Sequence, residues 1–297
     1  LPRLLEGVAP ARVFDGDPRD QPLEGVEFYA PLYMGDADSL AAMARMPRLQ
    51  VCQVLTAGYE HVLPFLPDGV TLCNAAGVHD ASTAELAVGL AIARLRGLDD
   101  FARAMPQGEW LHDTRDSLAD RRVVVIGAGN VAMAIRRRLE PFEVEVVMVG
   151  RQPREGVRGA DELPALLPGA GVVILAVPLT EQTRHLVDDA FLSLLPDAAL
   201  VVNVARGPVA DTDAILRQAH RLRFALDVTD PEPLPPDHPL WREPSVLISP
   251  HVGGNTSAFA PPDQGAGQRA DPRMVRRSPA PKRRRRAVEL RIILLLP

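Results

Sequence analysis

Residues 122–139 read RVVVIGAGNVAMAIRRRL, and this stretch decides the fold of the chain. Arg122 to Ile126 is dominated by valine and isoleucine, as in a strand that is covered on both faces. The turn Gly127-Ala128-Gly129-Asn130-Val131-Ala132 follows, and Ala134 to Leu139 then shows a helical pattern. The order of strand, glycine turn and helix predicts the first half of a βαβ unit.

The glycine turn has the composition of a dinucleotide-binding turn. Gly127 permits a tight turn, Gly129 lets backbone amides approach a pyrophosphate, and the small Ala132 lets the helix pack closely on the strand. Many strand-to-helix turns have two glycines for packing alone, which is the alternative interpretation. The strand before the turn, the helix after it and the further βα units that follow favour dinucleotide binding.

Short apolar runs alternate with helical patterns on both sides of this turn, which predicts an α/β fold with parallel sheets. The chain of 297 residues is long for one hydrophobic core, so we expect two domains. The helix predicted from Ala81 to Leu95 begins with a Ser/Thr cap and is a candidate bridge between them. The predicted strands are Val26 to Tyr29, Leu49 to Leu55, Val70 to Cys73, Arg122 to Ile126, Val144 to Val149, Val172 to Val177, Leu200 to Val204, Phe224 to Val228 and Val246 to Ile248.

The position about 20 residues after the glycine turn discriminates between cofactors, because an acid there would bind the ribose 2′-hydroxyl of NAD. The strand ends instead in Gly150-Arg151-Gln152-Pro153-Arg154, without an acid. Arg151 and Arg154 suit the additional phosphate of NADP through forked, charge-assisted hydrogen bonds. The alternative is a solvated basic loop. The sequence thus predicts NADP as the preferred cofactor, with NAD as the second choice.

Three later segments supply the groups that reduction of a 2-keto acid requires. They are Asn203-Val204-Ala205-Arg206-Gly207, Pro231-Glu232-Pro233 and Ser249-Pro250-His251. Arg206 can hold a carboxylate and polarise a ketone, and His251 can donate a proton near neutral pH. Glu232 can bind the other ring nitrogen of His251, which fixes the tautomer and favours the protonated ring. Each residue alone has an ordinary structural interpretation, so the prediction depends on all three together.

The composition excludes several classes of function. Residues 261–297 contain ten Lys and Arg against three Asp and Glu, which leaves residues 1–260 with 23 against 35, and such an acidic body argues against nucleic acid as a partner. Two cysteines, Cys52 and Cys73, are too few for a disulfide framework and have no metal-ligand spacing, so no metal is expected. No signal peptide and no long apolar segment is present, so we expect a cytoplasmic protein without a membrane anchor.

Taken together, these segments resemble the D-2-hydroxyacid dehydrogenase family from about Val26 to about Phe259. The most specific pieces are Gly127-Ala128-Gly129, Asn203-Val204-Ala205-Arg206-Gly207, Asp227-Val228-Thr229-Asp230-Pro231-Glu232-Pro233 and Ser249-Pro250-His251-Val252-Gly253-Gly254. The resemblance implies a substrate domain followed by a Rossmann cofactor domain, two Rossmann-like or flavodoxin-like domains in all, with the active site in the cleft between them. It also implies a homodimer.

The resemblance assigns roles to individual residues. Arg206 would grip the substrate carboxylate and carbonyl, His251 would be the acid/base and Glu232 its partner, while Asp227 would hold the nicotinamide carboxamide. The loop Leu55-Thr56-Ala57-Gly58-Tyr59 would receive the carboxylate on backbone amides at Ala57 and Gly58, although an ordinary strand-end turn is the alternative. The cofactor contacts implied are Gly127, Gly129, Asn130, Val131, Arg151, Arg154, Val177, Pro178, Thr183, Val204, Ala205, Asp227 and Gly253. His79 and His112 are expected to be surface residues, and Trp110 and Trp241 packing anchors.

Two departures from the family pattern concern the ends of the chain. Only a remnant of the first βα unit, Leu1 to Phe14, is recognisable, so we expect a substrate domain over 1–97 that is incomplete at its N-terminus and a cofactor domain over 98–258. From Ala260 the sequence becomes rich in Pro, Gly and Arg without a helical period. We expect residues 259–297 to be an aberrant, disordered tail produced by a reading-frame shift; a nucleic-acid or targeting patch at Lys282 to Arg286 is the alternative.

The sequence therefore predicts an NADP-preferring enzyme that reversibly reduces a small 2-keto acid to a D-2-hydroxy acid. Formate dehydrogenase is a related possibility, but that branch pairs its histidine with glutamine, and Glu232 argues against it. A non-catalytic dinucleotide sensor resembling the carboxy-terminal-binding-protein co-repressors is an alternative of another class, since those proteins retain the same triad. An inactive truncated family member is a third.

Overall fold

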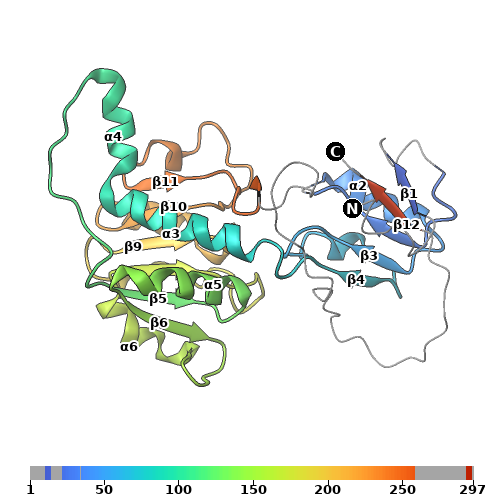
Figure 1. The fold of residues 1–297 in the computed structure, drawn as a ribbon, viewed down its shortest axis with the longest axis horizontal. Helices are drawn as coiled ribbons and strands as arrows, with labels where there is room; N and C mark the ends of the chain where they lie inside the picture. The colour runs from blue at the N-terminus through green and yellow to red at the C-terminus, as the bar shows by residue number, and fades with distance from the viewer. Residues whose placement is uncertain (1–10, 15–21, 34, 258–291, 296–297) are drawn as a thin grey trace. The chain divides into compact units, whose positions relative to one another are not determined.

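The structure is a computed structural model, and it describes residues 11–14, 22–33, 35–257 and 292–295. It divides into two compact units, drawn as a ribbon in Figure 1. Unit 1 contains the described residues of 1–79 and 259–297, and unit 2 contains residues 80–258. Each unit has its own parallel sheet, as the sequence predicts.

Unit 2 is built on a seven-stranded parallel sheet with the order β11-β10-β9-β8-β5-β6-β7. Alternate residues of its strands face opposite cores: Val123 and Val125 pack on one side, and Val124 and Ile126 on the other. All four are fully or almost fully buried, because helices cover both faces of the sheet. The strands are β5 (Arg122–Ile126), β6 (Glu145–Gly150), β7 (Arg158–Gly159), β8 (Val172–Leu175), β9 (Leu200–Asn203), β10 (Arg223–Leu226) and β11 (Val246–Ile248).

The helices of unit 2 form a layer on each face of this sheet. The face of Val123 packs on α3 and α5, and the face of Val124 packs on α6, α7 and α8. The α-helices are α3 (Asp80–Arg96), α4 (Leu98–Ala104), α5 (Asn130–Leu139), α6 (Leu163–Leu166), α7 (Asp189–Ser193) and α8 (Thr212–Gln218). The short 3-10 helices are η4 (Met105–Gln107), η5 (Glu140–Phe142), η6 (Ala160–Glu162), η7 (Leu167–Gly169), η8 (Gly207–Val209) and η9 (Pro239–Arg242).

Unit 1 has a five-stranded parallel sheet with the order β1-β12-β2-β3-β4. Tyr29, Met43 and Cys52 are almost completely buried in its core. The strands are β1 (Ala11–Phe14), β2 (Phe28–Ala30), β3 (Val51–Gln53), β4 (Thr71–Cys73) and β12 (Ile292–Leu295). The helices are α2 (Ala37–Ala41), η2 (Ala42–Arg45) and η3 (Leu63–Phe65).

The boundary between the units differs from the predicted one. The sequence places it after residue 97, whereas the structure places it between His79 and Asp80, so that α3 belongs to unit 2. The reason is packing: Ala84, Ala87 and Ala91 of α3 are fully buried in the same core as α5 and the sheet of unit 2. These small residues allow α3 to pack closely on unit 2. The apolar pattern of a helix shows which of its faces is buried, but it does not show which of two sheets that face covers.

Most of the predicted aberrant tail, residues 259–291 and 296–297, lies outside the described residues, as does the basic run Lys282 to Arg286. The described part of the tail differs from the expected disorder, because Ile292–Leu295 form β12 between β1 and β2. A run of four Ile and Leu residues has the composition of a strand inside a parallel sheet, and the Arg-rich sequence around it masked that signal.

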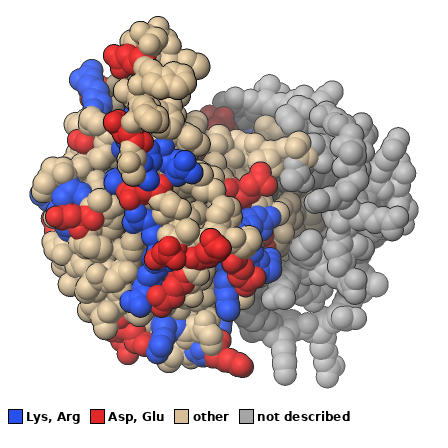
Figure 2. Space-filling model, turned by 60° about the vertical axis from the view of Figure 1, so that its left-hand side comes forward, with Lys and Arg blue, Asp and Glu red and all other residues tan. Residues whose placement is uncertain are grey.

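The two tryptophans, which were expected to be packing anchors, differ in their surroundings. Trp110, in the irregular segment between η4 and β5, is 91% exposed and is therefore not a buried anchor. Trp241 is half-exposed and donates its indole N–H to the carbonyl of Pro235. On the face shown in Figure 2, basic and acidic side chains are interleaved.

No helix in the described part of the chain is both long enough and apolar enough to cross a membrane.

The thiol of Cys52 on β3 is buried, and this burial predicts that it is unreactive in the native protein. Desolvation raises the pKa of its thiol from 9.0 to about 12, and the nearby Cys73 adds to the rise. A raised folded-state pKa stabilises the fold below pH 9 and loses that contribution as the pH rises towards 12. We expect iodoacetamide at pH 8 to leave Cys52 unmodified in the native protein and to modify it in guanidinium chloride, as read by peptide mass spectrometry. Equal alkylation in both states would contradict this burial.

Candidate active site

The three predicted catalytic residues follow the carboxyl ends of three neighbouring strands. Arg206 comes after β9, Glu232 after β10 and His251 after β11, and these strands are adjacent in the order β11-β10-β9. Parallel strands end at the same edge of a sheet, which is where open α/β sheets bind ligands. The tertiary structure therefore brings residues that are up to 45 positions apart in the sequence to one edge of unit 2.

His251 and Glu232 form a hydrogen-bonded pair. Nδ1 of His251 lies 2.5 Å from Oε1 of Glu232. The side chains of both residues are about one-third exposed, so the pair is accessible from solvent. Because Nδ1 is held by the carboxylate, Nε2 is the ring nitrogen that remains for proton transfer. This is the geometry of a general acid/base that is oriented by an anionic partner.

The backbone of His251 is held in an unusual conformation. Its φ is +53°, a left-handed value that residues other than glycine adopt infrequently. The amide of His251 donates to the carbonyl of Asp227 at 2.7 Å and lies 3.0 Å from the carbonyl of Ser249. These bonds fix the direction in which the imidazole leaves the loop.

The carboxylate of Asp227 organises the loop that contains His251. It is almost completely buried, and its Oδ1 accepts hydrogen bonds from the hydroxyl of Ser249 at 2.7 Å and the amide of Val252 at 2.9 Å. Its Oδ2 accepts from the amide of Gly253 at 3.0 Å. The sequence predicts that Asp227 contacts a nicotinamide carboxamide, and no contact here tests that role. Its role in positioning the loop escaped sequence analysis, because the partners lie more than 20 residues away.

The segment around Arg206 is anchored by the buried side chain of Asn203. Its carbonyl oxygen accepts from the amide of Ala205 at 3.0 Å, and its amide nitrogen donates to the carbonyl of Arg206 at 3.1 Å. Ala205 and the preceding Val204 are buried beneath the turn. The guanidinium of Arg206 is half-buried and donates from Nη1 to the carbonyl of Ala205 at 2.6 Å. Arg206 is thus held at the strand end as a cation.

Gly207 packs directly against the loop that leads to Glu232. A Cβ at Gly207 would lie 1.8 Å from the carbonyl oxygen of Thr229, which is far inside van der Waals contact. The backbone of the Arg206 loop therefore touches the backbone of the loop after β10. Only glycine permits this approach, which fixes how far the Arg206 segment lies from the segment of Glu232.

The glycine turn after β5 has the predicted shape. Gly127 has a φ of +137°, and a Cβ there would lie 2.3 Å from the carbonyl oxygen of Ala176, just after β8. Gly129 precedes α5 without a capping side chain, and nothing lies within 4 Å of the place where its Cβ would be. The first amides of α5, at Asn130 and Val131, have no intrahelical acceptors. An open, positively polarised helix end of this kind fits a pyrophosphate.

The two predicted phosphate-binding arginines flank this turn. Both are exposed; Arg151 follows the end of β6, which pairs with β5. Arg154 donates from Nη2 to the carbonyl of Ala128 at 2.8 Å, which draws its guanidinium to the glycine turn. Residues 150–154, at the end of β6, contain no acid.

Val177, Pro178 and Thr183 come after β8, the neighbour of β5 on its other side. The hydroxyl of Thr183 donates to the carbonyl of Pro178 at 2.7 Å and accepts from the amide of Thr180 at 2.8 Å. Thr183 therefore closes a turn beside the glycine turn. Gly253, the last predicted cofactor contact, is bonded to Asp227 as described.

The predicted substrate loop lies in unit 1, where its carbonyl groups are bound by neighbouring side chains and backbone. The carbonyl of Ala57 accepts from Nδ2 of Asn74 at 2.7 Å, and that of Gly58 from the hydroxyl of Thr56 at 2.6 Å. The amides of Ala57 and Gly58 bind no acceptor among the described residues. With carbonyls fixed and amides open, the loop can accept an anion.

His79 supports this loop and is the main residue that sequence analysis misjudged. It was expected on the surface, as was His112, which is exposed. Instead His79 is buried, with Nε2 lying 2.8 Å from the carbonyl of Leu55. Its ring centroid lies 5.5 Å from that of Tyr33, and the two rings are tilted by 39°. An isolated histidine gives no local signal of burial, because its partner lies 24 residues earlier.

Comparison with known proteins adds independent findings. A family model described as "D-isomer specific 2-hydroxyacid dehydrogenase, NAD binding domain" matches residues 88–253. The glyoxylate reductase of Thermofilum pendens is 30% identical over 233 residues, which are 72% of this chain and 68% of that protein.

Two solved structures illustrate the structural similarity. A D-isomer specific 2-hydroxyacid dehydrogenase from Xanthobacter autotrophicus Py2, in complex with NADPH and MES, is 30% identical with a TM-score of 0.68, covering 84% of this chain and 81% of that one. An NADPH-dependent glyoxylate/hydroxypyruvate reductase from Sinorhizobium meliloti, in complex with NADP and sulfate, is 26% identical with a TM-score of 0.71, covering 81% and 79%.

The contact at Gly207 predicts the effect of adding one methyl group. We expect Gly207→Ala to destabilise unit 2 by about 1–3 kcal/mol, because the new Cβ forces two backbone segments apart. Gly89→Ala is the matched control: Gly89 is exposed in α3 with nothing near its Cβ position, so this change should stabilise the protein by about 0.5–1 kcal/mol. Urea unfolding followed by circular dichroism measures both. Equal stability of the two variants would refute the close approach.

Proposed function

The chain belongs to the D-isomer specific 2-hydroxyacid dehydrogenase family, and from this premise we propose that it reduces a small 2-keto acid to the D-2-hydroxy acid. The family's cofactor domain binds NAD(P), and the reaction is reversible. The observation that supports catalysis by this chain is the hydrogen bond between His251 and Glu232 at the carboxyl edge of the sheet.

In the proposed reaction His251 moves a proton at Nε2. During reduction the imidazolium donates this proton to the oxygen of the 2-carbonyl group, and during oxidation the neutral ring removes it from the hydroxyl group. Glu232 holds Nδ1–H, which keeps the ring in one tautomer and stabilises its positive charge. Asp227 acts through the loop: its three hydrogen bonds hold the backbone from which His251 extends.

Arg206 is the proposed electrophile and carboxylate anchor. Its guanidinium can form a forked pair with a carboxylate and direct a further N–H at the ketone oxygen, where negative charge develops. In unit 1, the open amides of Ala57 and Gly58 are the donors that we propose for the substrate carboxylate. Carboxylate binding to fixed backbone amides costs little reorganisation, because the carbonyls of the same loop are already bonded.

The glycine turn fits a dinucleotide. The open N-terminus of α5 would hold the pyrophosphate, Arg151 and Arg154 the 2′-phosphate of NADP, and the segments containing Val177, Pro178, Thr183, Val204, Ala205, Asp227 and Gly253 the rest. A bound reduced nicotinamide would supply the hydride that the carbonyl carbon needs to become an alcohol carbon. The preference for NADP is supported by the missing acid after β6 and by the position of Arg154 on the glycine turn.

Glyoxylate and hydroxypyruvate are the substrates that we propose first. The relatives are named for these two keto acids: the Thermofilum protein for glyoxylate and the Sinorhizobium protein for both. Both acids are small, and both present the carboxylate next to the carbonyl that Arg206 and His251 require. We also propose a homodimer, which is supported by the strongly exposed apolar side chains of Leu98, Met105 and Trp110 on and after α4.

The role of His251 can be tested by turnover. His251→Ala should reduce kcat by about 10²- to 10⁴-fold, because the proton donor is lost, while NADPH binding persists. Glu232→Gln should also reduce kcat, since an amide can orient the ring without stabilising its charge. The control is His220→Ala, at an exposed histidine two residues after α8. Absorbance of NADPH with glyoxylate or hydroxypyruvate follows the reaction.

If His251→Ala turns over like His220→Ala, this histidine is not the acid/base. Wild-type protein that binds NADPH but reduces neither keto acid would favour the non-catalytic nucleotide sensor instead.

Cofactor preference provides a separate test. A forked Arg–phosphate contact is worth about 1.5–3 kcal/mol, which corresponds to roughly tenfold or more in kcat/KM for NADPH over NADH. Arg151→Ala should remove most of that preference and leave the kinetics with NADH nearly unchanged. Arg158→Ala is the control, because this exposed arginine on β7 is paired with Glu162. Equal kcat/KM values for the two cofactors in the wild type would make Arg151 part of a solvated loop.

A further inference from the structure

A polar pocket of about 380 Å³ lies in unit 2, at the opposite end of β10 from Asp227. Arg223 is the first residue of β10 and lines this pocket, whereas Asp227 follows the last residue of the strand. Four residues of strand separate the two ends by about 13 Å. The other lining residues come from the end of α3, from α4 and from the segment before β5: Arg94, Leu95, Asp100, Thr114, Arg115 and Asp116.

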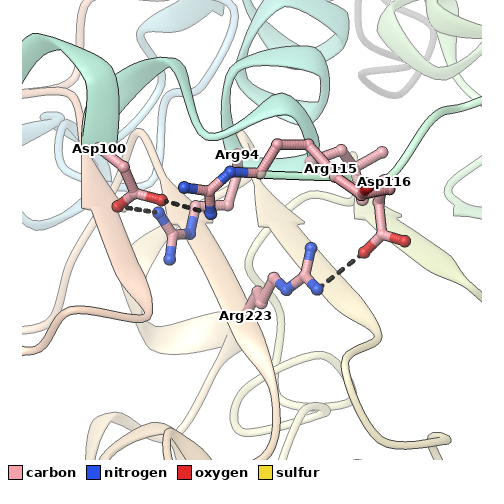
Figure 3. A pocket seen from close by; sticks show the side chains of 7 residues that line it. Arg94, Asp100, Arg115, Asp116 and Arg223 are labelled. Carbon is pink, nitrogen blue, oxygen red and sulfur yellow. Dashed lines mark hydrogen bonds and ion pairs between the residues drawn. The ribbon is translucent and has the colours of Figure 1, made fainter. Parts of the chain in front are cut away.

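Three guanidinium groups line this pocket together with two carboxylates, as Figure 3 shows. Arg94 belongs to α3 and is nine-tenths buried, while Arg115 and Arg223 are about three-quarters buried. The lining therefore has one excess positive charge. The wider network of ion pairs around the pocket also has one more cation than anions. It joins five arginines, Arg94, Arg103, Arg115, Arg121 and Arg223, to four aspartates, Asp99, Asp100, Asp113 and Asp116.

The acceptors of the lining are already engaged. Asp100 accepts from Arg103 on Oδ1 at 2.6 Å and from Arg115 on Oδ2 at 3.2 Å. Asp116 is paired with Arg121 through Oδ1 at 2.5 Å and with Arg223 through Oδ2 at 2.7 Å. Every carboxylate oxygen of the lining thus has a cationic partner, and a cation in the pocket would find no unpaired oxygen.

The donors of the lining, in contrast, are in surplus. Arg94 uses its two Nη atoms, bonding to Asp99 at 2.5 Å and to the carbonyl of Pro244 at 2.8 Å. The Nε atoms of Arg94 and Arg115 are buried and have no acceptor within the described part of the chain. A guanidinium has more N–H groups than these bonds occupy, so the unmet capacity of the pocket is for acceptors.

We propose that this pocket binds a small oxyanion, with a carboxylate or phosphate group held among Arg94, Arg115 and Arg223. The surplus of guanidinium donors, the saturated carboxylates and the excess positive charge all favour an anionic acceptor, and arginine forks match planar carboxylates and phosphates. The volume is at the small end of the range for ligand pockets. The site is separate from the proposed active site and does not depend on the proposed reaction.

Helix α3 links this pocket to the His251 loop. Arg94 lies near its C-terminal end. Near its N-terminal end, Thr83 is one of the two side chains that a Cβ at Gly253 would meet, at 3.3 Å, the other being Asp227 at 3.0 Å. An anion that fixes Arg94 thus acts on the helix that borders the loop organised by Asp227. Because the pocket exists only in the folded unit, an anion bound there should also stabilise unit 2 against unfolding.

Isothermal titration of the full-length protein with inorganic phosphate, at constant ionic strength, tests the proposal. We expect saturable binding in the wild type and at least a tenfold higher Kd in Arg223→Gln and in Arg115→Gln. Arg223→Lys keeps the charge but loses the fork and should fall between them. Arg158→Gln is the surface control and Arg206→Gln the active-site control, and both should retain the wild-type Kd at this site. Acetate and malonate in place of phosphate identify the preferred oxyanion.

Circular dichroism of each variant establishes that it is folded before it is titrated. If a pocket variant does not fold, NMR of the wild-type protein labelled with ¹⁵N-arginine takes the place of its titration. Phosphate should then shift the Nε–H resonances of Arg94 and Arg115. Absence of saturable binding, binding that Arg206→Gln abolishes and the pocket variants leave intact, or unshifted Nε–H resonances would each overturn the proposal.

Discussion

Burial of both faces of the seven-stranded parallel sheet is the constraint on which the rest of unit 2 depends. Val123 to Ile126 alternate between two cores, and each such side chain contributes about 1.5–3 kcal/mol when it is removed from water. A sheet that is covered on both faces leaves only its edges for chemistry. Because all its strands are parallel, the loops after β5, β8, β9, β10 and β11 emerge at one edge, where the predicted cofactor and catalytic residues lie.

Backbone contacts at that edge convert a common architecture into a specific arrangement. Gly127 touches the chain after β8, and Gly207 touches the chain after β10, so two glycines set the spacing of four loops. Asp227 then fixes the loop of His251 with a buried carboxylate that accepts three hydrogen bonds. A buried carboxylate is costly without such donors, so the loop and the carboxylate stabilise each other. These contacts fix the positions of the two loops from which His251 and Glu232 extend.

The opposite end of the same sheet is organised by charge. There the ion pairs of Arg94, Arg115 and Arg223 are partly or largely buried. Leaving one of these guanidinium groups without a partner would therefore cost more free energy than breaking the exposed pair of Arg217 and Asp189. That exposed pair lowers the pKa of Asp189 through the hydrogen bond from Arg217, and solvent screens it. One sheet thus has an edge arranged by backbone contacts and an edge arranged by guanidinium groups.

The sequence by itself determined every strand of unit 2 except the two-residue β7, the glycine turn, the missing acid after β6 and the order of Arg206, Glu232 and His251, because each of these features lies in a local pattern of a few residues. Only the tertiary structure decided that α3 belongs to unit 2, that Ile292–Leu295 enter the sheet of unit 1 and that His79 is buried under Leu55. The same holds for the three bonds of Asp227 and for the pocket shared by Arg94, Arg115 and Arg223. These features arise from contacts between residues far apart in the chain. A local pattern of hydrophobicity or charge does not specify which distant residue a side chain will contact.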